Sequence, residues 1–345
     1  MTALSPPAAP PALPELPALL DLSAVDPDAL PLLARLTDAD AAVRRIAMFE
    51  LADLEDPELV PVFVATLGAD PAAEVRREAA LALAAWEQHD AVDALCAALL
   101  DTDDGVRDAA AQSLSELKEP ASGATLRRWA ERPEPFVVRA VLRGLRELRY
   151  ADAWQPALAA LDADDAGVRL EAVAVLGWLK DARALPRLAA LATGDAQAEV
   201  RRAAAGALGF GVDADDTAAP VAAALLAALA DNAWQVREAA AVTLGRLRAR
   251  AAVAALEHAL DDPYWQVRLR ATCALGLIGE RASGPKIAAL LVHSISNLRK
   301  EAALALGELR DPAALDALRS TLDDADPEVR KAVRIAIGQI EQAGA

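Results

Sequence analysis

Three histidines and two cysteines are the side chains of this chain best suited to metal binding or nucleophilic catalysis. His89, His258 and His293 lie far apart, and no H-x3-H, C-x2-C or H-E-x2-H spacing occurs. Cys273 and His293 lie in neighbouring segments and could approach as a Cys–His pair, but small and apolar neighbours of Cys273 favour a buried, inert thiol. Cys96, in A-L-C-A-A-L-L, reads as a core residue. The sequence therefore predicts no metal site, no catalytic centre and no cofactor.

An arginine cluster offers a different chemistry, the binding of an anionic partner. Residues 127–149 carry seven arginines against three glutamates, in a chain whose formal net charge is −17. Arg139, Arg143 and Arg146 fall on one face of a predicted helix, and three guanidinium groups there suit carboxylates or phosphates. The alternative is a solvated face balanced by acidic neighbours.

Aromatic residues mark a second candidate site. Trp234 and Trp265 precede identical Gln-Val-Arg triplets, and Tyr264 adjoins Trp265. Exposed Trp and Tyr are typical anchors of protein interfaces. The competing interpretation is that both tryptophan rings pack in the turns of adjacent repeats and fill a gap.

The elements that position these residues come from a repeat of about 31 residues. Each copy has an Asp, a Val-Arg pair ending six residues later, and then Ala and Leu three and seven residues after the Arg. The Arg position recurs at Arg44, Arg76, Arg107, Val138, Arg169, Arg201, Arg237, Arg268, Arg299 and Arg330. Positions −1, +3, +7 and +10 from the Arg fall within about 80° on a helix, which predicts a buried stripe on the second helix of each repeat.

A first helix is predicted before each second one, for example over 59–67, 91–100, 184–191 and 313–322. The Asp at −6 lies in the turn between them, where we expect it to cap the second helix. Two such helices bury too little core to stand alone, so the units must stack. The sequence therefore predicts an all-α fold, a right-handed α-solenoid of about ten two-helix repeats over residues 21–345. A Pro/Ala-rich arm over 1–20 is expected to be disordered, and an insertion near 209–217 to form a flexible acidic loop.

The D-x5-V-R-x2-A-x3-L-G spacing resembles HEAT-like repeats over about residues 26–342. The short period resembles more closely the subtype found in phycobilisome lyase subunits, because ordinary HEAT repeats run to about 40–47 residues. This resemblance implies that second helices line a concave face and that the Asp and Arg form a structural ladder between repeats. Deoxyhypusine hydroxylase, a HEAT-like enzyme, binds iron through His-Glu dipeptides, and this sequence contains none.

The predicted concave face combines basic and apolar rows. Position +1 is basic in six of ten copies and acidic in two, and position +5 is mostly apolar. Such a groove suits an acidic, amphipathic segment of a partner protein. We predict that binding involves Trp234, Tyr264, Trp265, Arg139, Arg143, Arg146, Arg202, Leu269 and Lys300.

Charge and hydropathy narrow the class of function. An excess of 52 acidic over 35 basic residues disfavours binding to nucleic acid or to anionic membranes. No secretory signal is seen, and the longest apolar run, 218–230, is too short to span a bilayer, so we expect a soluble cytoplasmic protein. We predict a non-enzymatic scaffold or adaptor for a protein partner. The alternative is a lyase-type or maturation subunit that assists cofactor attachment to a client protein, and nucleic-acid binding ranks third. Oligomeric state stays open.

Overall fold

The computed structural model describes residues 20–21, 23–210 and 215–344. Helices are the only regular elements over these residues, and they come in pairs, as the repeat predicts. The chain divides into two compact units, Met1–Val175 and Leu176–Ala345. The predicted arm lies largely outside the described residues, and so does the centre of the predicted insertion.

The first unit holds five helix pairs, the last of which it shares with the second unit at the boundary within α10. Its first helices are α1 (Ala29–Arg35), α3 (Val60–Ala69), α5 (His89–Ala98), α7 (Ser122–Trp129) and α9 (Trp154–Ala160). Its second helices are α2 (Ala41–Ala52), α4 (Ala73–Ala82), α6 (Asp104–Ser115), α8 (Pro135–Glu147) and α10 (Ala166–Leu179).

The second unit continues the same order. Its first helices are α11 (Leu185–Gly194), α13 (Asp215–Ala228), α15 (Val253–Ala259), α17 (Gly284–Ala288) and α19 (Leu315–Arg319). Its second helices are α12 (Ala198–Ala207), α14 (Trp234–Arg246), α16 (Trp265–Ile278), α18 (Ser296–Leu309) and α20 (Pro327–Gly344). The predicted all-α solenoid of two-helix repeats is thus confirmed.

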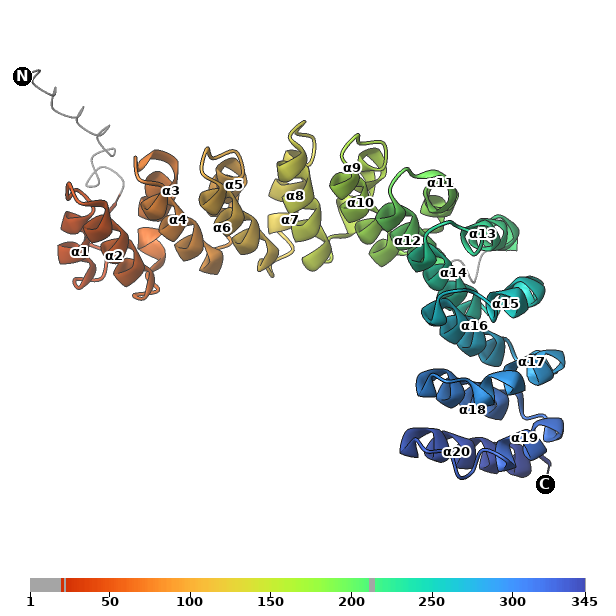
Figure 1. The fold of residues 1–345 in the computed structure, drawn as a ribbon. Coiled ribbons are helices and arrows are strands. Elements are labelled where there is room, and N and C mark those ends of the chain that lie inside the picture. Colours follow the sequence, from red (N-terminus) through yellow and green to blue (C-terminus); the bar gives the residue numbers. More distant parts are fainter. Residues whose placement is uncertain (1–19, 22, 211–214, 345) are drawn as a thin grey trace, which may run out of the picture. The chain divides into compact units, whose positions relative to one another are not determined.

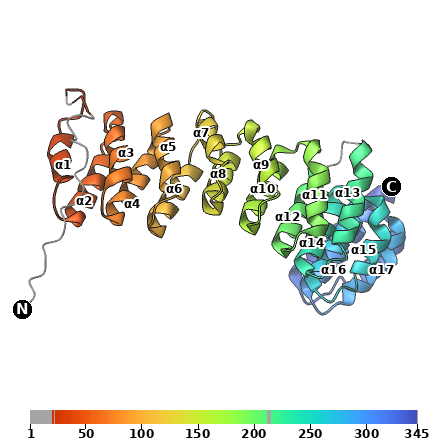
Figure 2. The same ribbon diagram turned by 90° about the horizontal axis from the view of Figure 1, so that it is seen from above.

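Within each unit, first helices pack on first helices and second helices on second helices (Figures 1 and 2). The predicted stripe of the second helix forms the core between these layers. In α4 and the 3₁₀ turn that follows it, for example, Val75, Ala79 and Leu83 at the −1, +3 and +7 positions are completely buried. Small Ala side chains at +3 let neighbouring helices approach closely, and Leu at +7 supplies most of the apolar area.

Four first helices, α3, α11, α17 and α19, follow a short 3₁₀ turn that an acidic residue caps. The side chain of Asp56 accepts a hydrogen bond from the amide of Glu58, at the start of the turn before α3. Asp181 and Asp311 do the same before α11 and α19. These caps satisfy amides that have no partner inside the helix, and they fix where each first helix starts.

No helix within the described ranges is long and apolar enough to cross a membrane. We call the layer made by the second helices the second-helix face, and the candidate site lies on it.

Candidate partner-binding surface

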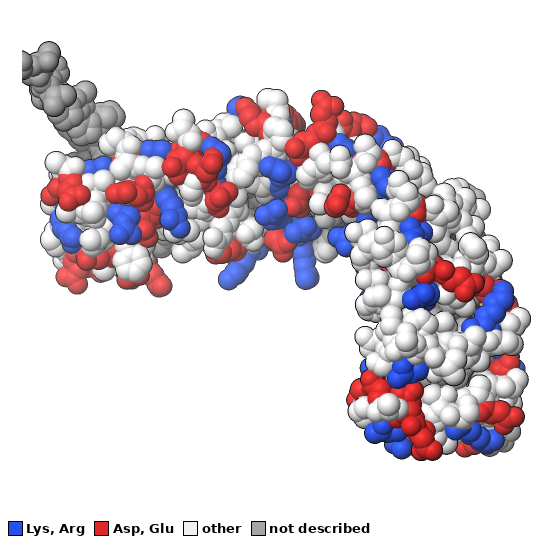
Figure 3. Space-filling model, in the orientation of Figure 1, with Lys and Arg blue, Asp and Glu red and all other residues white. Residues whose placement is uncertain are grey.

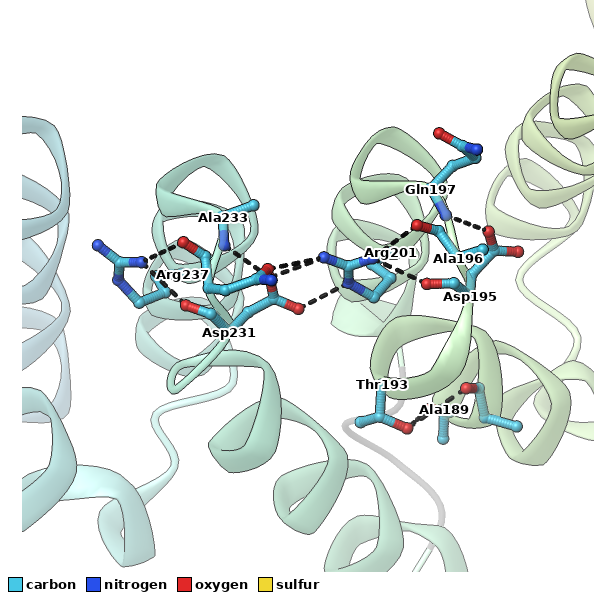
Figure 4. A network of polar contacts seen from close by, with 11 residues as sticks. Ala189, Thr193, Asp195, Ala196, Gln197, Arg201, Asp231, Ala233 and Arg237 are labelled. Atoms are coloured by element: carbon cyan, nitrogen blue, oxygen red, sulfur yellow. Dashed lines mark hydrogen bonds and ion pairs between the residues drawn. The ribbon is translucent and has the colours of Figure 1, made fainter.

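A ladder of arginine and aspartate side chains joins the turns of successive repeats. In each complete rung the Arg donates through Nε and Nη2 to both carboxylate oxygens of the Asp in the next repeat, at 2.6–2.9 Å. Its Nη1 donates to the carbonyl oxygen six residues earlier, as Figure 4 shows for Arg201 and Arg237. Complete rungs include Arg44–Asp70, Arg76–Asp101, Arg201–Asp231, Arg237–Asp262 and Arg299–Asp324. The ladder is structural, because its donors and acceptors satisfy one another.

The ladder aspartates have a second partner that corrects the expected cap. Asp231 Oδ1 accepts from the amide of Ala233 at 2.8 Å, and Ala233 is the residue just before α14. Asp70 and Asp262 bind the equivalent amides of Ala72 and Tyr264. The Asp therefore fixes the turn that leads into the second helix and does not cap the amides of the helix itself.

The ladder should make the fold sensitive to acid. The pKa of Asp101 lies below its ordinary value chiefly because Arg76 donates to the carboxylate, and Arg299 acts likewise on Asp324. A carboxylate with a depressed folded-state pKa stabilises the fold fully above its unfolded pKa of about 4, and this contribution is lost as the pH falls through the folded-state pKa. We expect urea midpoints to stay level between about pH 7 and 5 and to fall below about pH 4. The Asp101→Asn variant should start less stable but lose less on acidification, and an equal loss would contradict this assignment.

The fourth repeat interrupts the ladder. Val138 on α8 and Ala163 before α10 replace the Arg and the Asp, and an open pocket of about 630 Å³ lies where their side chains would meet. Arg132, at the Asp position of this repeat, pairs with Glu134 instead. Two successive rungs are thus altered in the first unit.

Arg107 has other partners, because the next repeat has Arg132 in place of the ladder aspartate. It binds Asp104 of its own helix, and its guanidinium carbon lies 5.7 Å from the centroid of the Phe136 ring. Arg139 approaches the same ring at 5.9 Å. Sequence reasoning missed Phe136, although it lies two residues before the register position and is unlike the residues found there in other copies.

The three arginines predicted on α8 do lie together, but they have acidic partners. Arg143 and Arg146 both bind the carboxylate of Glu171 on α10, at 2.9 and 3.1 Å. Arg139 folds across Gly167 at the start of α10, where a Cβ atom would lie 2.7 Å from its Cδ. In Figure 3, basic side chains (blue) gather over the repeat formed by α7 and α8. The surface is therefore basic, but acidic side chains neutralise part of its charge. This agrees with the alternative interpretation, in which the arginines form a solvated face balanced by acidic neighbours.

A shallow groove runs between α6 and α8 beside these arginines. Its volume is about 450 Å³, and Phe136, Arg139 and Arg143 line one side of it. Asp108 and Gln112 of α6 line the other side. The groove thus offers an aromatic ring, two cations and a carboxylate within one inter-helix space.

Exposed basic and apolar residues alternate one turn apart along the second-helix face. On α2, Arg45 lies four residues before Phe49, whose side chain is 54% exposed. On α4 and α20 the same pairing joins Arg77 to Leu81 and Lys331 to Ile335, and all four side chains are exposed. In α14, α16 and α18 the apolar residues at this position, which are Val242, Cys273 and Leu304, are half-buried between neighbouring helices.

The predicted aromatic anchors pack on one another. Trp234 stacks on Tyr264 with ring centroids 5.6 Å apart and planes within 16° of parallel. Arg237 lies 5.7 Å from the Tyr264 ring, beside its rung with Asp262. Trp234 and Trp265 are half-buried, whereas Tyr264 remains 45% exposed. The stack is a packing contact of the kind that the competing interpretation expects, but for Trp234 alone, and Tyr264 is the ring that it leaves most accessible.

The remaining predicted residues are separated along the second unit. Leu269 is half-buried on α16, and Arg202 is exposed on α12. Lys300 on α18 lies 3.7 Å from Glu328. The nine predicted residues therefore fall into an arginine group in the first unit and an aromatic group in the second unit. The others are single residues of the second unit.

The histidine and cysteine side chains have structural surroundings. Both ring nitrogens of His89 are engaged, by Thr125 Oγ1 at 2.8 Å and by Arg128 at 3.2 Å. Burial, followed by the charge of Glu301, raises the pKa of Cys273 to about 11, the opposite of what a thiolate nucleophile requires. Burial also raises the pKa of the Cys96 thiol. Over the part of the chain that the structure covers, no group of three or more His, Cys, Asp and Glu side chains is placed to hold a metal ion.

Comparison with known proteins identifies the family of the repeat and shows which solved structures have a similar fold. A family model described as HEAT repeats matches residues 29–115, 63–145, 126–209, 191–276, 221–303 and 256–338. No curated protein matches the chain. Among solved structures, an engineered protein gives a TM-score of 0.52 at 19% identity and covers 91% of this chain and 99% of its own.

Kap95p gives higher TM-scores than the engineered protein. Its complexes with RanGDP and with Nup1 give TM-scores of 0.67 and 0.64 at 15% identity, and each covers 92% of this chain. This chain spans about half of Kap95p, 50% and 51% in the two structures. At such low identity these similarities concern the fold alone.

Proposed function

Because this chain belongs to the HEAT-repeat family, we propose that it is a non-enzymatic scaffold whose second-helix face binds a protein partner. The observation that carries the proposal is the repeated pairing of an exposed cation with an exposed apolar side chain one turn away, as at Arg45 and Phe49. Phe49 and Leu81 hold the same register position on the neighbouring helices α2 and α4, and exposed apolar side chains that are grouped in this way mark interaction surfaces. We propose the cytoplasm as the place of action and treat residues 21–345 as one repeat domain.

The partner that this face suits is an acidic, amphipathic segment. Its apolar side would cover Phe49, Leu81 and their equivalents, and its carboxylates would meet the adjacent Arg and Lys. Some ion pairs already on the face are exposed, for example Lys300–Glu328 at 3.7 Å, and such pairs contribute at most about 1 kcal/mol. They can therefore be exchanged for carboxylates of a partner at little cost. Preformed helices also keep the ordering cost of binding small.

The aromatic group provides the test of this proposal. We expect the Trp234→Ala/Trp265→Ala variant to stay folded and to bind the partner at least about tenfold more weakly, because interface tryptophans are typical hot spots. The measurement is affinity capture from the native host, identification of the protein retained, and titration of that protein against both forms.

Trp178→Ala is the matched control. Trp178 is a tryptophan that is more exposed than Trp234 and Trp265, but it lies on α10 outside the predicted group, so its loss should leave the affinity unchanged. A folded double variant that retains every partner at full affinity would show that the aromatic group is not the anchor.

The alternative proposal rests on the repeat length. The period of about 31 residues resembles that of the phycobilisome lyase-like subtype. On this reading the chain would have an accessory role in attaching a cofactor to a client protein or inserting it there. A chromophore or metal that co-purifies with a client complex would support this reading. Nucleic-acid binding is disfavoured by the net charge of −17, and a mobility shift at low salt would be needed to revive it.

A further inference from the structure

The rung between α16 and α18 is built differently from the complete rungs. Arg268 occupies the Arg position, and His293 occupies the Asp position of the next repeat. In the complete rungs the Arg side chain gives two hydrogen bonds to a carboxylate and one to the carbonyl oxygen six residues earlier, as Arg237 and Arg299 do. Arg268 Nε, by contrast, is buried and has no hydrogen-bond partner among the described residues.

His293 explains why this rung stays open. Its Nδ1 accepts a hydrogen bond from the amide of Ile295 at 3.0 Å, the role that the ladder Asp has in other turns. With Nδ1 as an acceptor, the proton of the neutral ring is on Nε2. The position therefore keeps its contact with the turn but brings no carboxylate to accept from Arg268. Arg268, which has only donors, cannot pair with it.

Unsatisfied polar atoms are concentrated at this place. Three buried side-chain N or O atoms lack a partner across the described residues, and two of them are Gln266 Oε1 and Arg268 Nε, both in the first turn of α16. Buried polar groups in native proteins are almost always satisfied, so a concentration of exceptions suggests that a partner supplies the missing atoms. The same turn begins with Trp265 and follows Tyr264, the exposed ring of the aromatic group.

We propose that a carboxylate of the protein partner completes this rung, accepting from Arg268 Nε and Nη2. This inference rests on the proposed scaffold function and names the chemistry at its aromatic group. A planar carboxylate is the ligand that five equivalent guanidinium groups already hold at 2.6–2.9 Å. Phosphate is the less suitable ligand, because a dianion carries more charge than the single carboxylate found at this position in the complete rungs. The net charge of −17 on the chain also repels it.

The decisive variant is His293→Asp, which places a carboxylate of the chain itself in the rung. If Arg268 is held open for a ligand, this variant should close the rung, raise the melting temperature by roughly 2 °C or more, and remove the response to added carboxylate. His293→Asn is the matched control, because its side-chain oxygen can still accept from the Ile295 amide but brings no negative charge. It should keep the response of the wild type.

The probe is sodium acetate, titrated against chloride at constant ionic strength into the full chain. The readout is the Nε–H resonance of Arg268, assigned by its loss in Arg268→Gln. A saturable shift in wild type and in His293→Asn, absent in His293→Asp, supports the proposal. No saturable shift, a shift that persists in His293→Asp, or a stronger response to inorganic phosphate than to acetate would overturn it.

A second experiment tests this inference separately from the scaffold function. Once a protein partner is captured, His293→Asp should weaken its binding about tenfold or more, while leaving the chain folded and at least as stable. If the partner binds His293→Asp as tightly as wild type, the rung inference fails and the scaffold stands. If no partner is found, the scaffold proposal fails, and the acetate titration still decides whether the rung takes a carboxylate.

Discussion

Replacing Asp70 with alanine is expected to lower the free energy of unfolding by about 3–5 kcal/mol, because it leaves a buried guanidinium without its counter-ion. The Arg44–Asp70 rung is the most enclosed of the ladder, with side-chain exposures of 8% and 0%. The substitution also removes the acceptor of the Ala72 amide and so loosens the turn into α4. Urea unfolding followed by circular dichroism measures the loss, and hydrogen exchange should locate it at α2 and α4.

The control for Asp70→Ala joins the same two helices by an exposed ion pair. Arg45 and Glu78 lie 3.7 Å apart with side-chain exposures of 47% and 19%. Glu78→Ala should therefore cost no more than about 1 kcal/mol. Equal losses in Asp70→Ala and Glu78→Ala would mean that burial of the rung does not decide its contribution.

The fold could be predicted from the sequence because one period fixes most of the contacts. Val267, Ala271 and Leu275 recur at helical spacing, and all three are completely buried. A stripe of this kind needs a neighbour on each side, and identical copies supply it. The pairing of Arg237 with Asp262 follows from the same register, since the two residues hold fixed places in successive repeats.

The candidate site could be predicted only in part, because helical phase describes one helix at a time. It placed Arg143 and Arg146 on one face correctly, but it gave no distance to Glu171 on the next helix, which binds both. The contact of Arg107 and Arg139 with Phe136 was missed for the same reason. Such contacts depend on side-chain conformation and on the spacing between neighbouring helices.

Departures from the repeat mark the places where this chain differs from a simple stack. Loss of both rung residues at Val138 and Ala163 coincides with an open pocket, and the change to His293 coincides with an unsatisfied Arg268. A regular rung satisfies itself and leaves nothing for a ligand. Recognition is therefore expected where the ladder is incomplete, and these two places are the first to examine by substitution.

Close helix packing in the second unit depends on glycine at the +8 position. A Cβ atom on Gly276 of α16 would lie 3.0 Å from both Cα and Cβ of Ala305 on α18, and Gly307 faces Ala336 in the same manner. The backbone of the partner helix cannot move aside as a flexible side chain would. Gly206 of α12 differs, because a Cβ there would meet nothing within 4 Å.

Gly276→Val is therefore expected to destabilise the second unit by about 1–3 kcal/mol, since the added side chain forces α16 and α18 apart. Gly206→Ala, a substitution in the same kind of helix, should be neutral or stabilise by up to about 1 kcal/mol, because alanine has the higher helix propensity. Thermal and urea unfolding of both variants gives the comparison. If valine at position 276 were tolerated without loss, the second helices would have to pack less closely than the approach of Gly276 to Ala305 requires.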